Sequence, residues 1–469
     1  MSDGARPLRI AVVGAGPAGF YAAAQLLQSD LPAEVDMFDR LPTPWGLVRL
    51  GVAPDHPKIK SVSRVFETTA ELSGFRFLGN VEVGRDLTHA ELARHYDAVV
   101  YAVGAEADRP LGIPGEDLPG SWPARAFVAW YNGHPDYADL DFDLSHERAV
   151  VVGNGNVALD VARMLMLTPA ELAATDVADH ALHALARSRV REVVVLGRRG
   201  PAQASFTTLE LKELGELEGA RVEVDPGGLP FDPVGAQEPD RTATARRNVE
   251  LLAQWARPQP AKRGRVIRLR FLVSPVALCG ERHVEAVEVV RNRLALDESG
   301  AVAALPTDAF ETIACGLVLR SVGYRGLPLA GLPFDERRAV VPNDQGRVAG
   351  PGGAPLPGVY CAGWIKRGPN GIIGTNKKDA AETIDALLAD ARAGRLPAVA
   401  EPAPEAIDRL LAERGAEVVD YDGWRRIDAA ERARGEREGR PRAKLSSWEA
   451  LLAAAAGSAA SRPIASLTP

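Results

Sequence analysis

The sequence predicts an α/β fold with two separate three-layer domains, and two observations support this prediction. Glycine-rich turns at residues 14–19 and 153–158 each follow a short apolar run and precede a helical pattern, which is the strand–turn–helix order of a dinucleotide-binding unit. A length of 469 residues also exceeds one ordinary core and fits two or three domains. Both domains are therefore expected to be Rossmann-like nucleotide-binding domains.

The elements of the first unit follow from the order of apolar runs and turns. They are a strand at 8–13, the first glycine turn, a helix at 20–28, a strand at 35–38 ending in Asp39, a Pro- and Gly-rich loop at 41–57, and a strand at 98–103. This order predicts a βαβ unit at the N-terminus.

The second unit has the same pattern, with a strand at 149–152, a helix at 159–167 and a strand at 193–196. A later strand at 359–362 enters a glycine-rich loop, and a helix follows at 379–389. We expect one discontinuous domain and one inserted domain. Their expected limits are residues 1–105 plus 331–469 for the first and 106–330 for the second.

Composition excludes several classes of protein. Apolar residues make up 46% and charged residues 25%, which excludes a fully disordered or fibrous chain. A net charge of −7 argues against a nucleic-acid-binding protein. No apolar run reaches the roughly 18 residues that a membrane span needs, and residues 1–9 leave no room for a signal peptide. We expect a cytoplasmic protein without a membrane or nucleic-acid partner.

The cysteines limit the redox chemistry that this chain can carry by itself. Cys279, Cys315 and Cys361 are widely spaced, and no C-x-x-C motif occurs. A disulfide framework, a four-cysteine iron–sulfur cluster and a redox-active dithiol are therefore excluded. No metal site is predicted.

Each glycine turn provides the small residues that a dinucleotide needs at positions one, three and six. The first turn has Gly14, Gly16 and Gly19. The second has Gly153, Gly155 and Ala158. A single match could be a purely structural turn, but two matches in the same context favour nucleotide binding.

The two turns differ at the end of the following strand. Asp39 stands at the end of the strand that follows the first turn and its helix. A carboxylate at this position can hold a ribose diol. Arg198 and Arg199 stand after the strand that follows the second turn and its helix. Two guanidiniums at this position suit a 2′-phosphate, although the two arginines could also be an ordinary solvated pair. We predict FAD at the first site and NADP(H) at the second, with hydride transfer between nicotinamide C4 and flavin N5. Electrons must then leave to an external acceptor.

Longer motifs resemble one family. They are GAGPAG at 14–19, LPTPWGLVRLGVAPDHPK at 41–58, GNGNVALDVAR at 153–163, GRRGP at 197–201, FTTLELKE at 206–213 and GWIKRGPNGIIGTNK at 363–377. The chain resembles the adrenodoxin-reductase-type ferredoxin–NADP⁺ reductases, especially the actinobacterial members, from about residue 8 to 452. The resemblance implies a glutathione-reductase-like topology and electron transfer from NADPH through FAD to ferredoxin.

The resemblance also implies residue roles. FAD would be held by Ala18, Asp39, Leu47, Val83, Trp364, Gly371, Ile372 and Ile373. NADP⁺ would be held by Asn154, Gly155, Asn156, Val157, Arg198, Arg199, Glu210 and also Gly371. Asp39 departs from the glutamate that is frequent in the family, which shortens the reach to the ribose but keeps the charge.

His56 resembles the active-site histidine of the family, and Asp160 and Glu213 match acidic positions near the nicotinamide or the histidine. We expect His56 to tune the electrostatics and proton supply of the flavin, with no general base required. Two simpler interpretations stay open. His56 could merely shape a turn, and Asp160 could form an exposed i,i+3 pair with Arg163.

Residues 241–270 form a basic stretch in an acidic chain, with nine Arg and Lys residues opposed only by Glu250. Because ferredoxins are acidic, this stretch predicts a docking face. Its candidate residues are Arg241, Arg246, Arg247, Lys262 and Arg263. An ordinary solvated face, or a strand with its cations on two sides, is the alternative, and nucleic-acid contact is less favoured because no aromatic residues are interleaved. A monomer is expected.

Two functions other than a ferredoxin reductase are alternatives for this sequence. One is an NADPH-oxidising flavin subunit of a larger complex, as in glutamate synthase, but the cluster-binding cysteines of that family are lacking. The other is a non-catalytic flavoprotein that senses nucleotides. Only a turnover assay separates this second alternative from an enzyme.

Overall fold

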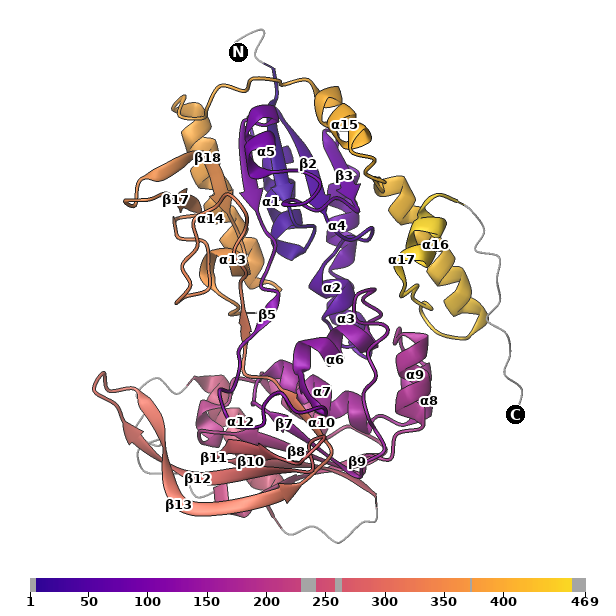
Figure 1. The fold of residues 1–469 in the computed structure, drawn as a ribbon, viewed down its shortest axis with the longest axis vertical. Coiled ribbons are helices and arrows are strands. Elements are labelled where there is room, and N and C mark those ends of the chain that lie inside the picture. The colour runs from indigo at the N-terminus through magenta and orange to yellow at the C-terminus, as the bar shows by residue number, and fades with distance from the viewer. Residues whose placement is uncertain (1–5, 229–241, 258–263, 372, 458–469) are drawn as a thin grey trace.

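The computed structural model describes residues 6–228, 242–257, 264–371 and 373–457, which form two units placed end to end (Figure 1). The upper unit in Figure 1 contains the N-terminus and a seven-stranded sheet, and the lower unit contains a six-stranded sheet. Strands from residues 8–101 and 343–361 build the upper sheet, whereas strands from residues 121–320 build the lower sheet. The first unit is therefore discontinuous in sequence.

The upper sheet has a parallel centre and a short antiparallel edge. In spatial order its strands are β16 (Asn343–Asp344), β17 (Arg347–Ala349), β18 (Pro355–Cys361), β4 (Ala98–Tyr101), β1 (Leu8–Val13), β2 (Ala33–Asp39) and β3 (Phe75–Gly79). The strands from β18 to β3 pair in parallel, and β16 and β17 form the antiparallel edge.

Both faces of the upper sheet are covered, which explains why β1 is apolar at nearly every position. Ile10 and Val12 pack on one side, and Ala11 and Val13 pack on the other. The first side carries α1 (Pro17–Leu27), α4 (Ser63–Ala70), α14 (Thr375–Arg392), α16 (Tyr421–Arg437) and α17 (Trp448–Ala455). The second side carries α5 (His89–His95), α13 (Trp364–Arg367) and α15 (Pro404–Glu413).

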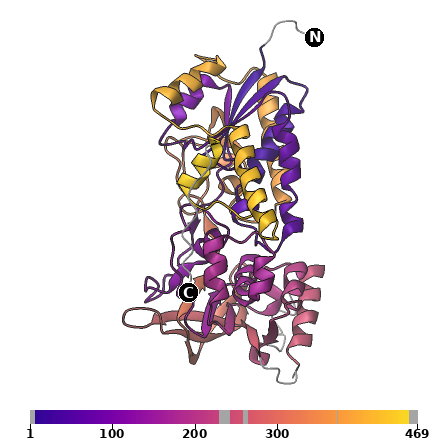
Figure 2. The same cartoon turned by 90° about the vertical axis from the view of Figure 1, so that its right-hand side faces the viewer.

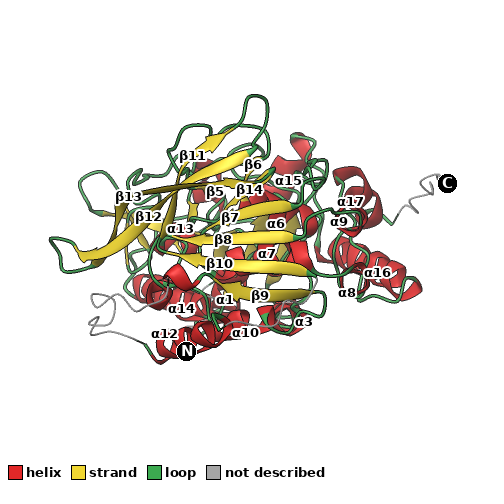
Figure 3. Cartoon of the chain, turned by 90° about the horizontal axis from the view of Figure 1, so that it is seen from below, coloured by secondary structure: helices red, strands yellow, loops and turns green. Residues whose placement is uncertain are grey.

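The lower sheet is parallel throughout, and Figure 3 shows its strands from below. In spatial order they are β6 (Ser121–Pro123), β14 (Leu317–Arg320), β7 (Arg148–Val152), β8 (Glu192–Gly197), β10 (Arg265–Phe271) and β9 (Ala220–Val224). Helices pack on one face, namely α6 (Ala124–Tyr131), α7 (Asn156–Met166), α8 (Pro169–Ala173), α9 (Asp179–Ala186), α10 (Thr208–Leu214) and α12 (Ala243–Trp255).

The other face of the lower sheet is covered by an antiparallel sheet instead of helices. Its strands are β11 (Val273–Cys279), β12 (Ala286–Leu296) and β13 (Val302–Ala314). Val150 and Val194 of the parallel sheet share a core with Val287 and Ile313 of this antiparallel sheet. The lower unit is thus a three-layer domain with one helical layer and two sheet layers.

Two short antiparallel strands connect the units. The chain enters the lower unit at β5 (Ala107–Asp108) and returns at β15 (Tyr324–Arg325), and these strands pair with each other. We propose domain limits near residues 105 and 331 on this basis. Towards the C-terminus, α16 and α17 lie alongside the upper unit and reach towards the lower one (Figure 2).

Some predicted boundaries were wrong. The predicted loop at 41–57 contains the short helix α2 (Leu47–Leu50) and leads directly into α3 (Pro57–Lys60). Helix α14 starts at Thr375, earlier than the predicted residue 379, because its first turn is polar and lacks an apolar period. Two 3-10 turns also occur, at Pro201–Gln203 and Pro226–Gly228. Among the described helices, none is long and apolar enough to span a membrane.

Candidate nucleotide sites and active site

The first glycine turn meets all three requirements of a dinucleotide site. Gly14 has φ +109°, and a Cβ there would lie 2.6 Å from the carbonyl oxygen of Ala102. A Cβ at Gly19 would overlap the carbonyl oxygen of Gly14, so close packing of α1 on β1 requires glycine. A Cβ at Gly16 would meet no protein atom within 4 Å. Gly16 therefore leaves room for a phosphate at the N-terminus of α1.

The second turn has the same geometry at β7 and α7. Gly153 has φ +131°, and a Cβ there would overlap the carbonyl oxygen of Ser321. A Cβ at Gly155 would meet no protein atom within 4 Å, and Ala158, at position six, is fully buried. Each turn thus fits a pyrophosphate, and the donor sets suit the predicted FAD and NADP(H).

Asp39 lies at the end of β2, where it also closes the first turn. Its Oδ2 accepts a hydrogen bond from the backbone N–H of Ala15 at 2.8 Å, and its Oδ1 accepts one from Leu41 at 2.9 Å. Burial raises the pKa of Asp39 to about 6, against the lowering effect of these two amides. Asp39 therefore shapes the turn itself, and its contact with a ribose stays a proposal.

Segments distant in sequence converge on the first turn. The backbone N–H of Trp45 donates to the carbonyl oxygen of Ala15 at 2.7 Å, and a Cβ at Gly363 would lie 2.7 Å from the Cβ of Ala18. The indole N–H groups of Trp45 and Trp364 are buried and have no hydrogen-bond partner within the described part of the chain. These two donors fit a polar aromatic ligand such as the flavin head of FAD.

The other predicted flavin residues lie in loops or at helix starts. Leu47 begins α2 and is 40% exposed, and Val83 is half-buried in a bridge with Leu87. Gly371 has φ +85°, and Ile373 packs against the upper core. The predicted residue Ile372 lies outside the described residues.

Arg198 and Arg199 follow β8, beside the second turn. A Cβ at Gly197 would lie 2.8 Å from the side-chain amide of Asn154, which shows how closely the two segments approach. Arg198 is exposed and Arg199 is half-buried. Neither guanidinium has an ion pair among the described residues, so both are available to a phosphate.

Asn154 and Asn156 connect the second turn to α10. The carbonyl oxygen of Asn154 accepts a hydrogen bond from the backbone N–H of Ser205 at 3.0 Å. The side-chain oxygen of Asn156 accepts one from Thr207 at 2.8 Å. Thr207 is the N-cap of α10, the helix that carries Glu210 and Glu213. Val157 lies in the first turn of α7 and is half-buried.

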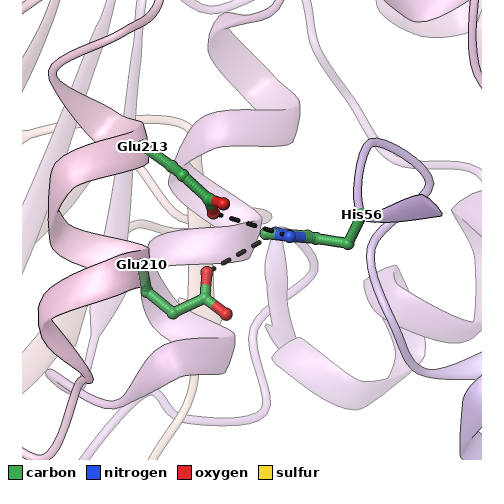
Figure 4. Close-up of side chains that lie close together, drawn as sticks. All are labelled: His56, Glu210 and Glu213. Atoms are coloured by element: carbon green, nitrogen blue, oxygen red, sulfur yellow. Dashed lines mark ion pairs between the residues drawn. The ribbon is translucent and has the colours of Figure 1, made fainter. Parts of the chain in front are cut away.

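His56 lies where the two units meet, and its ring points toward Glu210 and Glu213 on α10 of the lower unit (Figure 4). Its Nε2 is 3.3 Å from Oδ1 of Asp160 and 3.4 Å from Oε2 of Glu210. Its Nδ1 is 3.5 Å from Oε2 of Glu213. His56 is 6% exposed, and the structure brings the predicted residues His56, Asp160 and Glu213 together from α7, α10 and the loop before α3.

Arg163 is a central member of this cluster that was not predicted to act there. Its guanidinium contacts Nε2 of His56 and lies 2.5 Å from Asp55 and 2.7 Å from Asp160. The predicted i,i+3 pair with Asp160 forms, but the Arg163 side chain is only 3% exposed. The alternative of an exposed pair is therefore wrong. The signal for Arg163 was its place one helical turn after Asp160.

Charge coupling sets the protonation of the cluster. Burial lowers the pKa of His56, but the hydrogen bond and charge of Asp160 outweigh it, so the net pKa is raised. Burial and the Asp160 charge raise the pKa of Glu210 to about 7. Both His56 and Glu210 therefore hold a proton more strongly than the free side chains do.

The cluster also has the composition of a metal site, since ligand atoms of His56, Glu210 and Glu213 lie within 4.8 Å of one another. However, the guanidinium of Arg163 already contacts Nε2 of His56 and lies 3.4 Å from Glu210. An internal cation thus occupies the position that a metal would need, and we propose no metal here.

The fold and site define a class of protein, the two-domain flavoprotein oxidoreductases that bind a pyridine nucleotide. Residues 8–196 match the family described as pyridine nucleotide-disulphide oxidoreductase. The chain is 50% identical to the NADPH-ferredoxin reductase FprA of Mycobacterium tuberculosis over 459 residues, which cover 95% of this chain and 99% of that protein. The chain belongs to the NADPH-ferredoxin reductase family.

Two further comparisons agree. The solved structure of M. tuberculosis FprA in complex with NADPH has a TM-score of 0.90 and 49% identity, with coverage of 96% of this chain and 100% of that one. The mitochondrial NADPH:adrenodoxin oxidoreductase of Arabidopsis thaliana is 42% identical over 468 residues, 97% of each chain. The predicted fold class, enzyme class and cofactors are confirmed. The individual site residues stay predictions.

Proposed function

We propose that this chain transfers electrons from NADPH through FAD to a ferredoxin, in the reaction NADPH plus two oxidised ferredoxins to NADP⁺, H⁺ and two reduced ferredoxins. The observation that carries the proposal is the pair of glycine turns on two units with a buried histidine–acid cluster between them. When bound, FAD accepts a hydride from NADPH and releases electrons singly.

The residues of this chain bind and orient the two nucleotides. The N-termini of α1 and α7 face the pyrophosphates, since backbone N–H groups and the helix dipole favour anions there. Arg198 and Arg199 select NADPH over NADH through the 2′-phosphate. Trp45 and Trp364 offer their indole N–H groups to the flavin head.

The cluster around His56 holds and moves the proton that the reaction releases. Nε2 of His56 is enclosed by Arg163 and Asp160, whereas Nδ1 faces Glu213, whose side chain is 29% exposed. Glu213 is therefore an acid that both lies near the buried imidazole, at 3.5 Å, and has a partly exposed side chain. We assign it as the outlet for the proton, with Glu210, at a pKa of about 7, as a second carrier.

We place the proposed docking face on fewer residues than the basic stretch 241–270. On β10, Arg268 pairs with Glu192 and Glu223, and Arg270 pairs with Asp225 and Glu311. These two cations are therefore neutralised within the chain. By contrast, Arg246 and Arg247 on α12 are exposed and have no ion pair among the described residues. Arg241, Lys262 and Arg263 lie outside the described residues. We propose α12 as the docking element for an acidic ferredoxin.

A turnover assay tests the function. FAD-loaded protein with NADPH and an acidic ferredoxin should reduce cytochrome c only when the ferredoxin is present at catalytic amounts. A sensor would show no ferredoxin-dependent turnover, and a subunit of a larger complex would need an added partner protein. A monomeric state and a cytoplasmic location stay predictions.

A further inference from the structure

Two lysines share one buried aspartate between the units. Nζ of Lys60, the last residue of α3, lies 2.6 Å from Oδ1 of Asp176 in the lower unit. Nζ of Lys444 lies 3.3 Å from Oδ2 of the same residue. The Lys60 and Lys444 side chains are 14% and 1% exposed. Burial of two ammonium groups is costly, so this contact requires its partners to stay in place.

Asn132 holds the other end of the same segment. Its Nδ2 donates to the carbonyl oxygen of Val52 at 3.1 Å, and its Oδ1 accepts from Lys444 at 3.0 Å. Asn132 is fully buried at the C-terminus of α6. The lower unit therefore fastens the segment from Val52 to Lys60 at both ends, and His56 lies in its middle.

Residues 434–440, which precede Lys444 in the chain, make further contacts with the part of the lower unit that contains Asp176. Arg434 lies 2.5 Å from Asp179, and Arg440 pairs with Asp179 and donates to the carbonyl oxygen of Val177 at 2.9 Å. Asp179 is three residues after Asp176. The same stretch of the lower unit thus receives both α3 and the segment that brings Lys444.

We propose that Lys60 is a positioning residue for hydride transfer, which acts through Asp176 to hold His56 within the cluster of Asp160, Glu210 and Arg163. α3 is a single helical turn with no buried residue of its own, so packing does not fix its position. Its polar contacts with Asp176 and Asn132 therefore fix it instead. This inference rests on the proposed electron transfer.

Substitutions of Lys60 distinguish a loss of His56 positioning from a general loss of protein stability. Lys60→Met removes the charge and leaves the Asp176–Lys444 pair intact, whereas Lys60→Arg keeps the charge. Lys58→Met is the matched control, since Lys58 is exposed on the same short helix and has no ion pair among the described residues. FAD content and the Kd for NADPH should stay within about twofold in all three variants, because no variant touches a nucleotide residue.

Two readouts test the proposal. Flavin reduction by NADPH in anaerobic stopped flow should slow by about tenfold or more in Lys60→Met, because displacement of the charged His56 cluster by about 1 Å disturbs the geometry of the site where hydride transfer occurs. Lys60→Arg should recover most of the rate, and Lys58→Met should match wild type. Amide hydrogen exchange in residues 52–60 should rise in Lys60→Met only.

The proposal is wrong if Lys60→Met shows the wild-type rate of flavin reduction and wild-type amide hydrogen exchange in residues 52–60. It is also wrong if the rate is slow and Lys60→Arg does not restore it. If Lys60→Met does not fold, Lys60→Gln takes its place with the same expected outcomes. Should wild-type flavin not be reduced by NADPH, the proposed function fails, and the exchange measurement still decides whether Lys60 holds residues 52–60.

Discussion

Oδ1 of Asp160 lies 3.3 Å from Nε2 of His56, although the two residues belong to different units. Asp160 is on α7, the helix whose N-cap is Gly155 of the second glycine turn. One helix therefore begins at the turn that we propose for the NADP(H) pyrophosphate and contacts the histidine of the other unit about one turn later. Placement of the nucleotide and placement of His56 thus depend on the same element.

Substitution of Asp160 should lower the pKa of His56. Asp160→Asn removes the carboxylate whose hydrogen bond and charge raise this pKa against burial. Without that hydrogen bond and charge the protonated imidazole is less stable, and burial then lowers the pKa of His56. Histidine NMR titration measures the shift, with the His56 signal assigned through His56→Gln.

Asp143→Asn is the control for that titration, because Asp143 pairs with His146 at 3.3 Å on the surface. It should leave the pKa of His56 unchanged. An equal His56 pKa in wild type and Asp160→Asn would show that Asp160 does not control the imidazole.

The two glycine turns should respond independently to added methyl groups. Gly16→Ala and Gly155→Ala both place a Cβ where no protein atom lies within 4 Å, at φ −84° and −99°, so both variants should fold. Gly16→Ala should weaken FAD by at least about tenfold, a cost of about 1.4 kcal/mol, and spare NADPH. Gly155→Ala should weaken NADPH binding and leave FAD binding unchanged.

Equilibrium titration with each nucleotide measures this crossover, and each variant is the control for the other. Loss of both cofactors from one variant, with normal circular dichroism, would contradict the assignment of one nucleotide to each turn.

Glu210 should make stability depend on pH between about 4.5 and 7. Because burial and Asp160 raise its pKa to about 7, the folded protein holds a proton in this window that the unfolded chain has released. Its contribution to stability is therefore complete below pH 4.5 and is lost as pH rises through 7. One such proton corresponds to a fall of about 1.4 kcal/mol per pH unit.

Glu210→Gln removes this titration, so its free energy of unfolding should fall less between pH 5 and 7.5 than that of wild type. Urea unfolding at equal FAD saturation compares the two proteins. Parallel stability curves across this range would mean that Glu210 is already ionised in the fold.

Nucleotide preference should depend on the two arginines after β8. The double variant Arg198→Ala and Arg199→Ala should raise the Kd for NADPH by about 10²-fold or more, since each lost charge-assisted hydrogen bond costs about 1.5–3 kcal/mol. Its Kd for NADH should hardly change. If the double variant loses affinity for NADPH and for NADH by the same factor, the two arginines do not bind the 2′-phosphate.

Ferredoxin docking should depend on α12. The double variant Arg246→Glu and Arg247→Glu should raise the KM for ferredoxin by at least about tenfold at low salt and less at high salt, because complementary charge steers association. Arg409→Glu on α15, exposed on the other unit, is the control. An unchanged KM in the α12 variant would remove this face from the account.

The glycine turns and parallel strands could be predicted because their signals are local. β1 has the bounds that its apolar run predicted, and Gly14, Gly16 and Gly19 show the three roles that their spacing requires. The short helix α2 was missed because four residues after Gly46 carry no period.

The contacts between the units could not be predicted, because they join residues far apart in sequence. Arg163 and Asp55 meet across the interface, and neither position has a pattern that reveals its partner. The ion pairs of Arg268 and Arg270 with acids of neighbouring strands could not be predicted for the same reason. Among the described residues of the basic stretch, Arg246 and Arg247 on α12 are exposed and have no ion pair.

Anaerobic mixing of the FAD-loaded protein with NADPH, and separately with NADH, measures hydride transfer to the flavin and the nucleotide preference together. We expect rapid bleaching of the flavin visible band by NADPH, much slower bleaching by NADH, and recovery of the oxidised spectrum when oxidised ferredoxin is added. No bleaching with either nucleotide would contradict the proposed function and leave a flavoprotein without the proposed electron transfer.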